Sequence, residues 1–158
     1  MKELELAWLA GIMEGEGTFS IYRQKINTKG CKDGQLRGTI SITNTDPFLI
    51  NKCQEIFKNI GVSMHLHSYD NKKGSTKTVY DLQTSKYTNV KKVCECLLPY
   101  LIGEKNAKAK MLLAFVSQRI DKGLYSKYDE EDWVQYHDFR SSETTRDTPI
   151  KGEDIVQQ

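Results

Sequence analysis

Long apolar runs, paired cysteines and an apolar leader segment are all missing from this 158-residue sequence. Without a run of about eighteen apolar residues, no transmembrane helix and no membrane partner are expected. The 4 cysteines include no Cys-x-x-Cys pair, which excludes a disulfide framework and a zinc module and favours a reducing, intracellular compartment. The first residues contain no cleavable apolar region, so we expect no secretory signal.

Apolar residues make up only 38% of the chain, but this fraction is sufficient for a hydrophobic core and argues against wholesale disorder. The length fits one compact domain and leaves little room for a second. The sequence also lacks an internal repeat, so any motif that it carries is present once.

The net charge of +2 conceals a strong asymmetry along the chain. Residues 21–128 contain 19 Lys and Arg against 8 Asp and Glu, whereas residues 129–158 contain 9 acidic and 3 basic side chains. Residues 1–20 are also acidic, with 4 Glu. A basic middle between acidic ends suggests a surface that binds a polyanion, although a generic lysine-rich surface would give the same composition.

Alternation of apolar and polar residues predicts four strands in two hairpins. Apolar side chains such as Phe19, Ile42 and Leu82 share one face, and Ser, Thr, Gln, His, Arg and Tyr side chains occupy the other. A polar sheet face is usually a solvated face, but here it belongs to the basic part of the chain and is a candidate binding surface. The four runs are residues 18–26, 36–44, 62–69 and 76–83.

Helical periodicity predicts helices before, between and after the two hairpins. Asp46 and Ser85 are the expected N-cap residues of the second and third helices, and Gly61 is expected to end the second. The element order is αββαββα, which indicates an α+β fold with a four-stranded antiparallel sheet covered by helices on one face. The remaining expected helices lie at residues 4–14, 105–121 and 129–138.

A stripe of small residues marks the first expected helix. Ala7, Gly11 and Gly15 recur four residues apart, so they lie on one side of the helix. Such a stripe lets two helix backbones approach closely, as where a helix packs against its own copy. Because glycine lowers helix propensity, we expect a reason in packing, and these positions are candidates for a homodimer interface.

Two glutamates, Glu14 and Glu16, follow where this helix gives way to the first strand. A carboxylate there opposes the helix macrodipole, which disfavours negative charge at a helix C-terminus. Such a local conflict is typical of a functional site, although solvated turn residues would show the same pattern.

The first helix ends in a nonapeptide that resembles the signature of the LAGLIDADG homing endonucleases: Leu9-Ala10-Gly11-Ile12-Met13-Glu14-Gly15-Glu16-Gly17. The order of elements over residues 4–121 is similar to that of the family, as is the end of the second strand at residues 42–46. The resemblance implies an endonuclease core at residues 1–125, with residues 126–158 as a C-terminal helix and polar tail of the same domain.

The resemblance also implies a role for each matching residue. Glu16 corresponds to the second acid of the motif, a ligand for the divalent metal (Mg²⁺ or Mn²⁺) that serves phosphodiester cleavage, with the backbone carbonyl of Gly15 assisting. Glu14 corresponds to the first acid, whose role is structural. Lys105 and Asn44 correspond to outer positions that polarise the phosphate or order water. The family often has a further basic residue shortly after the position of Asn44, which this sequence lacks.

The implied function is that of a homing endonuclease, a homodimer that cuts a long, roughly palindromic site in double-stranded DNA and has no small-molecule substrate. A catalytically silent nucleic-acid binder of the same fold, such as an intron maturase or a regulator, is one alternative. A basic α+β domain that binds another protein is a second. Glu16 argues against the silent binder, because a carboxylate aimed at phosphate is repelled.

The expected DNA contacts lie on the polar sheet face and in the hairpin loops. A zinc site is the alternative for His65 and His67, but no third ligand is close in sequence. Bases and phosphates are the expected partners of Tyr22, Gln24, Arg37, Thr39, Ser41, His65, His67, Lys72 and Lys73.

Overall fold

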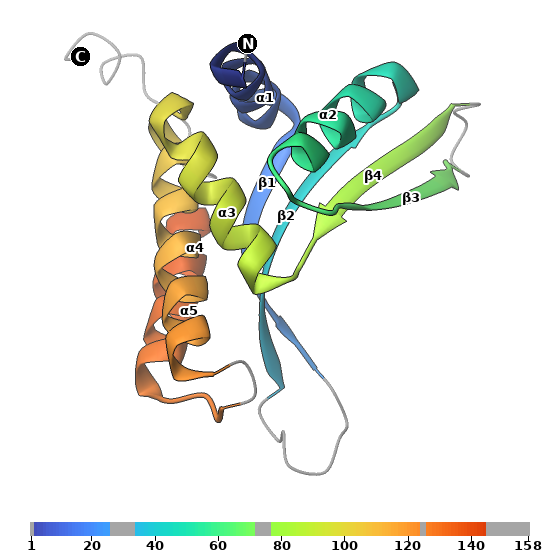
Figure 1. Ribbon diagram of the computed structural model, residues 1–158. Coiled ribbons are helices and arrows are strands. Elements are labelled where there is room, and N and C mark those ends of the chain that lie inside the picture. The colour runs from blue at the N-terminus through green and yellow to red at the C-terminus, as the bar shows by residue number, and fades with distance from the viewer. Residues whose placement is uncertain (1, 26–33, 72–76, 124–125, 145–158) are drawn as a thin grey trace, which may run out of the picture.

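The computed structural model describes residues 2–25, 34–71, 77–123 and 126–144. The elements follow the expected order (Figure 1), and no helix within these ranges is long and apolar enough to cross a membrane. Lys72, Lys73 and the polar tail after residue 144 lie outside the described residues. The elements are α1 (Lys2–Glu16), β1 (Gly17–Gln24), β2 (Gln35–Asn44), α2 (Pro47–Asn59), β3 (His65–Asp70), β4 (Thr78–Thr84), α3 (Tyr87–Leu97), a 3₁₀ turn (Leu98–Tyr100), α4 (Gly103–Lys122) and α5 (Glu130–Thr144).

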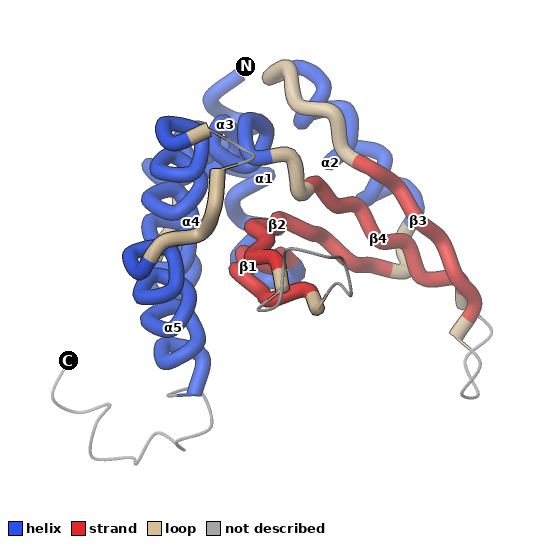
Figure 2. Tube along the Cα trace, turned by 90° about the horizontal axis from the view of Figure 1, so that it is seen from below, coloured by secondary structure: helices blue, strands red, loops and turns tan. Residues whose placement is uncertain are grey.

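The four strands form one antiparallel sheet in the order β1-β2-β4-β3, which confirms the expected fold class. Ile42 lies opposite Gly17 of β1 and opposite Leu82 of β4, so the register brings the apolar positions of neighbouring strands together. Figure 2 shows α1, α2 and α3 on one side of the sheet. No helix within the described ranges covers the other side, which we call the open face.

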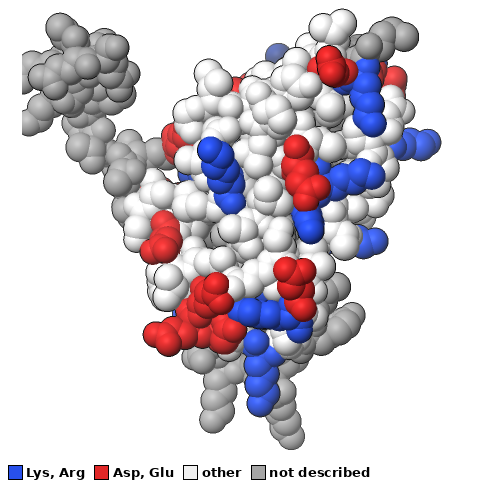
Figure 3. All heavy atoms as spheres, turned by 60° about the vertical axis from the view of Figure 1, so that its left-hand side comes forward, with Lys and Arg blue, Asp and Glu red and all other residues white. Residues whose placement is uncertain are grey.

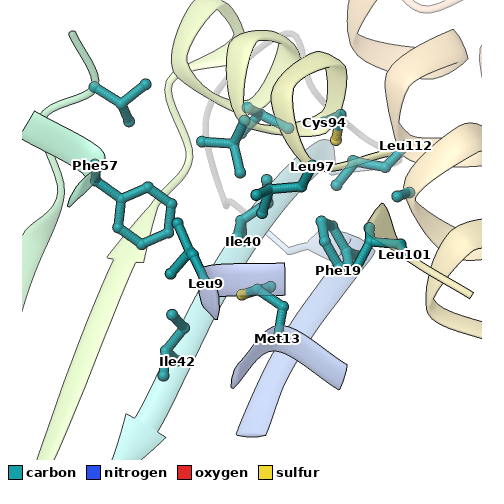
Figure 4. Close-up of a cluster of buried hydrophobic side chains, with 14 of the residues drawn as sticks. Leu9, Met13, Phe19, Ile40, Ile42, Phe57, Cys94, Leu97, Leu101 and Leu112 are labelled. Atoms are coloured by element: carbon teal, nitrogen blue, oxygen red, sulfur yellow. The ribbon is translucent and has the colours of Figure 1, made fainter. Parts of the chain in front are cut away.

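The core lies between the sheet and these helices. Leu9 and Met13 of α1 meet Phe19, Ile40 and Ile42 of the sheet (Figure 4), and each of the five is at most 1% exposed. Burial of one such side chain contributes about 1.5–3 kcal/mol relative to exposure. The alternation of apolar residues along the strands is therefore what fixes which face turns toward the helices and which stays open.

The start of α2 is built as the sequence indicates. The Asp46 carboxylate accepts hydrogen bonds from the backbone N–H groups of Phe48 (2.9 Å) and Leu49 (3.4 Å), and Pro47 occupies the first turn. Gly61 has a φ of +80°, a conformation that glycine adopts without strain, and the chain leaves the helix there.

Two local expectations are wrong. The N-cap position of α3 is Lys86, without a side-chain cap, because the Ser85 hydroxyl lies 2.9 Å from the Thr39 hydroxyl across the sheet. The third strand begins at His65 rather than at residue 62, and Leu66 is 39% exposed at this edge of the sheet. Tertiary contacts, rather than local pattern, decide both outcomes.

A buried ion pair joins α5 to α4. The Arg119 guanidinium lies 3.1 Å from the Asp132 carboxylate, and the two side chains are 1% and 0% exposed. Arg119 also donates to the carbonyl oxygen of Ser126 at 2.7 Å and lies over the Tyr128 ring, 4.4 Å from its centre. The Tyr128 hydroxyl donates to the carbonyl oxygen of Leu36 in β2. The pair therefore connects both long helices to the β1–β2 hairpin.

We expect Arg119→Met to lower the free energy of unfolding by about 3–5 kcal/mol, because the substitution leaves the Asp132 carboxylate buried without its counter-ion. A second variant with Asp132→Leu added should recover most of the loss, since both buried charges are then gone. Urea denaturation followed by circular dichroism gives the values. Glu55→Gln, which breaks an exposed pair with Lys52, is the control and should leave the midpoint unchanged.

Candidate nucleic-acid interface and catalytic centre

The candidate catalytic centre lies where α1 passes into β1 without a loop. Glu16 is the last residue of α1 and Gly17 the first of β1. A Cβ at Gly17 would lie 2.7 Å from the Met13 Cα, which is too close for any residue other than glycine. Because Gly17 pairs with Ile42, the end of α1 is held against the sheet. The Glu16 side chain is exposed there.

Glu14 links this junction to the start of α4. Its carboxylate accepts a hydrogen bond of 2.7 Å from the backbone N–H of Ile102, the residue that precedes α4. A carboxylate at a helix N-terminus is electrostatically favourable, since the first N–H groups there carry partial positive charge. Glu14 is half-buried, and this contact gives its carboxylate a hydrogen-bond partner within the chain.

Lys105 reaches the same junction from the first turn of α4. Its ammonium donates to the backbone carbonyl oxygen of Gly17, the residue directly after Glu16. The side chain is half-buried. The fold thus brings the Lys105 ammonium to the residue that follows Glu16, although the two are far apart in the sequence.

Asn44 lies at the same end of the sheet but is engaged in a turn. It follows Ile42 by two residues, so its backbone is close to the end of α1. Its side-chain oxygen accepts a hydrogen bond of 2.8 Å from the backbone N–H of Asp46. Strand alternation also places Asn44 on the side of Ile42, toward the helices, rather than on the open face.

One chain supplies a single carboxylate for a cation here. Among the described residues, the Glu16 carboxylate has no hydrogen-bond or ion-pair partner, and no group of three or more His, Cys, Asp or Glu could hold a metal. Gly15 is exposed, and its carbonyl is one of the last four of α1, which have no partner within the helix. This set fits Mg²⁺, which takes few carboxylates and completes its shell with water and phosphate oxygens.

The predicted DNA-contacting strand residues share the open face. Strand alternation and register place all seven described members of the set on the side opposite to Ile40, Ile42 and Leu82. Two further hydrogen bonds order this face: Arg37 Nε donates to Gln24 Oε1 at 2.9 Å, and the Thr39 hydroxyl meets Ser85. The seven are Tyr22, Gln24, Arg37, Thr39, Ser41, His65 and His67.

Eight more strand side chains belong to this face and are additional to the predicted set. They share its alternation: Thr18, for example, lies next to Ser41, and Thr43 lies next to Asp81. The apolar position of Leu82 is the signal in the sequence that locates its two neighbours in β4 on the opposite face. The eight are Thr18, Ser20, Gln35, Thr43, Tyr69, Val79, Asp81 and Gln83.

Basic charge is not concentrated on the sheet itself. Among the described strand residues, Arg37 is the one Lys or Arg on the open face, whereas Arg23 turns the other way and lies over the Trp133 ring of α5. Lys25 after β1 and Lys77 before β4 are exposed at the strand ends. The expected polyanion surface is therefore a neutral, hydrogen-bonding sheet with lysines at its margins.

An acidic cluster lies at the start of α5. Figure 3 shows acidic side chains gathered over the start of α5, with basic side chains beside them. The Lys122 Nζ lies 2.6 Å from Asp129 Oδ2 and 3.6 Å from Glu131 Oε2. The hydrogen bond between Lys122 and Asp129 raises the pKa of Lys122 and lowers that of Asp129, so both groups stay charged. Asp129 and Glu131 therefore share Lys122 as a counter-ion within the chain.

His65 and His67 form an edge-to-face pair with ring centres 4.4 Å apart. No third His, Cys, Asp or Glu completes a metal site with them among the described residues. The zinc alternative therefore gains no support, and the two rings remain polar groups on the open face.

Solved structures of DNA-bound endonucleases have a similar fold. The homing endonuclease I-CvuI in complex with its target matches with a TM-score of 0.70 and 19% identity, covering 99% of this chain and 92% of that one. The archaeal intron-encoded homing endonuclease I-Vdi141I, complexed with DNA, matches with a TM-score of 0.63 and 14% identity over 90% of this chain and 86% of that one. The group I intron-encoded homing endonuclease I-CeuI, also complexed with DNA, matches with a TM-score of 0.59 and 20% identity, covering 75% of this chain and 56% of that one. No curated protein sequence matches.

The sequence itself matches a family description. The model of the LAGLIDADG endonuclease family matches residues 9–116, which is more than half of the chain. The matched segment begins within the nonapeptide of α1 and ends in α4, so it includes Glu16, the whole sheet and Lys105. The chain therefore belongs to the LAGLIDADG endonuclease family.

Proposed function

We propose that this member of a DNA endonuclease family is a homing endonuclease that cuts both strands of a long, roughly palindromic DNA site by metal-dependent hydrolysis, acting as a homodimer. The observation that carries the proposal is the exposed Glu16 carboxylate, which has no partner among the described residues. It directly precedes Gly17, whose carbonyl oxygen accepts from the Lys105 ammonium, at the end of a sheet with a polar open face. The DNA-bound state of the structural neighbours supports double-stranded DNA as the partner.

A divalent cation, Mg²⁺ or Mn²⁺, would supply an activated water and neutralise charge on the scissile phosphate. Glu16 would hold the cation, with the carbonyl oxygen of Gly15 as a second oxygen donor. Neighbouring structures obtained with Ca and with Mg support a divalent ion. Glu16 meets no competing cationic side chain among the described residues, so its charge is available for a metal.

Lys105 acts on the phosphate in this proposal. Charge that develops on phosphate oxygens in the transition state is stabilised by a positioned ammonium in a site with little water. The carbonyl of Gly17 holds the Lys105 ammonium at the junction, so the group is positioned before DNA arrives. Asn44 contributes less directly, because its amide oxygen is held by the turn at Asp46.

The outer face of α1 supports a homodimer. Packing within one chain does not require glycine at positions 11 and 15, since a Cβ at either position meets no atom within 4 Å. Leu4 and Trp8 are 74% and 41% exposed, and they continue the same stripe at the spacing of a two-helix seam. Ala7 is also exposed. A second copy of α1 would cover this apolar stripe and bring two Glu16 carboxylates together.

Two-fold symmetry of the dimer explains both why two phosphates are cut and why the target is roughly palindromic. One motif per chain serves one strand, and a second copy related by a two-fold axis serves the other. The two open faces then lie along one DNA duplex, and each reads one half of the site.

A reducing compartment agrees with the state of the described cysteines. Cys53, Cys94 and Cys96 are free thiols. Burial raises the pKa of Cys53 to about 11 and that of Cys94 to about 12, so both thiols stay protonated and unreactive.

Glu16→Gln should abolish cutting while DNA binding persists. Glutamine keeps the size of the side chain but removes the charge that binds Mg²⁺, so cleavage should fall on the order of a hundredfold or more. Affinity should stay or improve, because a carboxylate near phosphate is neutralised. Binding in Ca²⁺ and cleavage in Mg²⁺ on one target measure the two effects, and normal cutting would refute the assignment of Glu16.

Two further variants separate chemistry from stability at this junction. Glu14→Gln should reduce cleavage less, and its loss should appear in thermal stability, because this side chain serves the N–H of Ile102. Lys105→Met should lower the single-turnover rate and leave the Mg²⁺ concentration for half-maximal cleavage unchanged. A large shift in that concentration would mean that Lys105 shapes the metal site itself.

Gly11→Leu should separate the subunits without unfolding the chain. The substitution adds a side chain where one chain leaves open space, and leucine favours helix over glycine by roughly 0.5–1 kcal/mol. Light scattering should give a monomeric mass, and double-strand cutting should be lost. Ala114→Leu, at an exposed position of α4, is the matched control and should stay dimeric. A wild-type chain that is monomeric while it cuts would contradict the dimer.

DNA affinity should fall steeply with salt, with a slope of about −0.9 for each phosphate that the protein neutralises. Arg37→Ala should relax selectivity at about one or two base pairs, because Arg37 lies on the open face. Lys72→Ala and Lys73→Ala should weaken binding evenly on all sequences and reduce the slope by about 1 each. Equal losses on every sequence for all three variants would contradict this division.

A further inference from the structure

An aspartate stands on the face that would meet DNA. Asp81 occupies a central position of β4, next to Leu82, and strand alternation places it on the open face. It is the one carboxylate among the described strand residues of that face, and it is half-buried. Phosphate repels a carboxylate, so an acidic side chain at this position needs a specific donor to offset that cost.

The neighbours of Asp81 leave one of its oxygens available. The Thr43 hydroxyl donates to Asp81 Oδ1 at 3.0 Å and fixes the orientation of the carboxylate. The other oxygen, Oδ2, has no hydrogen-bond donor among the described residues. In the register of β3 and β4, His67 is directly opposite Asp81, so an imidazole stands beside the carboxylate on the same face. An acceptor and a potential donor thus project together.

This arrangement matches one base pair in the major groove. Cytosine presents only a donor there, its N4 amino group, and guanine presents only the acceptors N7 and O6. Adenine presents the N6 amino group together with the acceptor N7, which a carboxylate cannot pair with. Asp81 therefore fits cytosine better than adenine, and an imidazole N–H of His67 can donate to the paired guanine.

We propose that Asp81 and His67 together select one C·G base pair in each half of the DNA target, with Asp81 Oδ2 accepting from cytosine N4 and His67 donating to guanine. The inference rests on the proposed function, because it needs the open face to bind duplex DNA. Thr43 is a positioning residue for Asp81.

Selection of bound duplexes from a randomised library, in Ca²⁺, tests the proposal. The wild-type chain should prefer C·G about tenfold at one position of each half-site. Asp81→Asn should move this preference to A·T, because an asparagine amide pairs with adenine N6 and N7. Asp81→Ala should remove the preference at that position and leave the others intact. His67→Ala should weaken it at the same position.

Asp70→Asn is the matched control. Asp70 also accepts a hydrogen bond from a threonine across β3 and β4, from Thr78 at 3.1 Å, but alternation places it on the opposite side of the sheet. The DNA sequences selected by the Asp70→Asn variant should equal those selected by the wild type. Unchanged selection by Asp81→Asn, or an even loss at all positions, would overturn the reading of C·G. A wild-type chain that binds no duplex would instead contradict the proposed function.

Discussion

Gly17 lets α1 pass into β1 without a loop, because its missing side chain leaves room for the Met13 backbone. The other features of the junction follow from that passage. Glu16 is carried to the end of the sheet, the Lys105 ammonium reaches the carbonyl of Gly17, and Glu14 ties the junction to α4. Leu9 and Met13 turn the inner side of α1 toward the sheet, so Gly11 and the residues in line with it face outward.

The two faces of the sheet differ in character. One face supplies the core, and the open face presents hydroxyl, amide and imidazole groups, which in the proposed function pair with base edges. Two tyrosines stabilise the hairpin that carries Arg37: the hydroxyls of Tyr87 and Tyr128 both donate to the carbonyl oxygen of Leu36. Since Arg119 and Asp132 hold Tyr128 in place, the helices α4 and α5 stabilise the geometry of the recognition surface rather than adding to it.

Local periodicity in the sequence predicts the fold well, because each strand buries one face and each helix one stripe. The Asp46 cap and the face shared by Tyr22, Arg37 and His67 follow from such patterns. Ser85 and the pair Arg119–Asp132 do not, since their partners lie far away in the chain and only tertiary packing selects them. Alternation around Leu82 predicts the face on which Asp81 lies, but only the strand pairing in the structure shows that Thr43 and His67 are its neighbours. The roles proposed for Glu16, Lys105 and Asn44 follow from the family resemblance rather than from periodicity.

In the proposed function, this chain cuts duplex DNA with a divalent metal held by Glu16 of two copies. Cleavage of a plasmid library by the wild-type chain, followed by sequencing of the ends, tests this function. We expect linear products in Mg²⁺ or Mn²⁺, none in EDTA, and ends that fall at one recurrent, roughly palindromic sequence with both strands cut at related positions. Duplex binding without any cutting in either metal, or nicks scattered without regard to sequence, would contradict it.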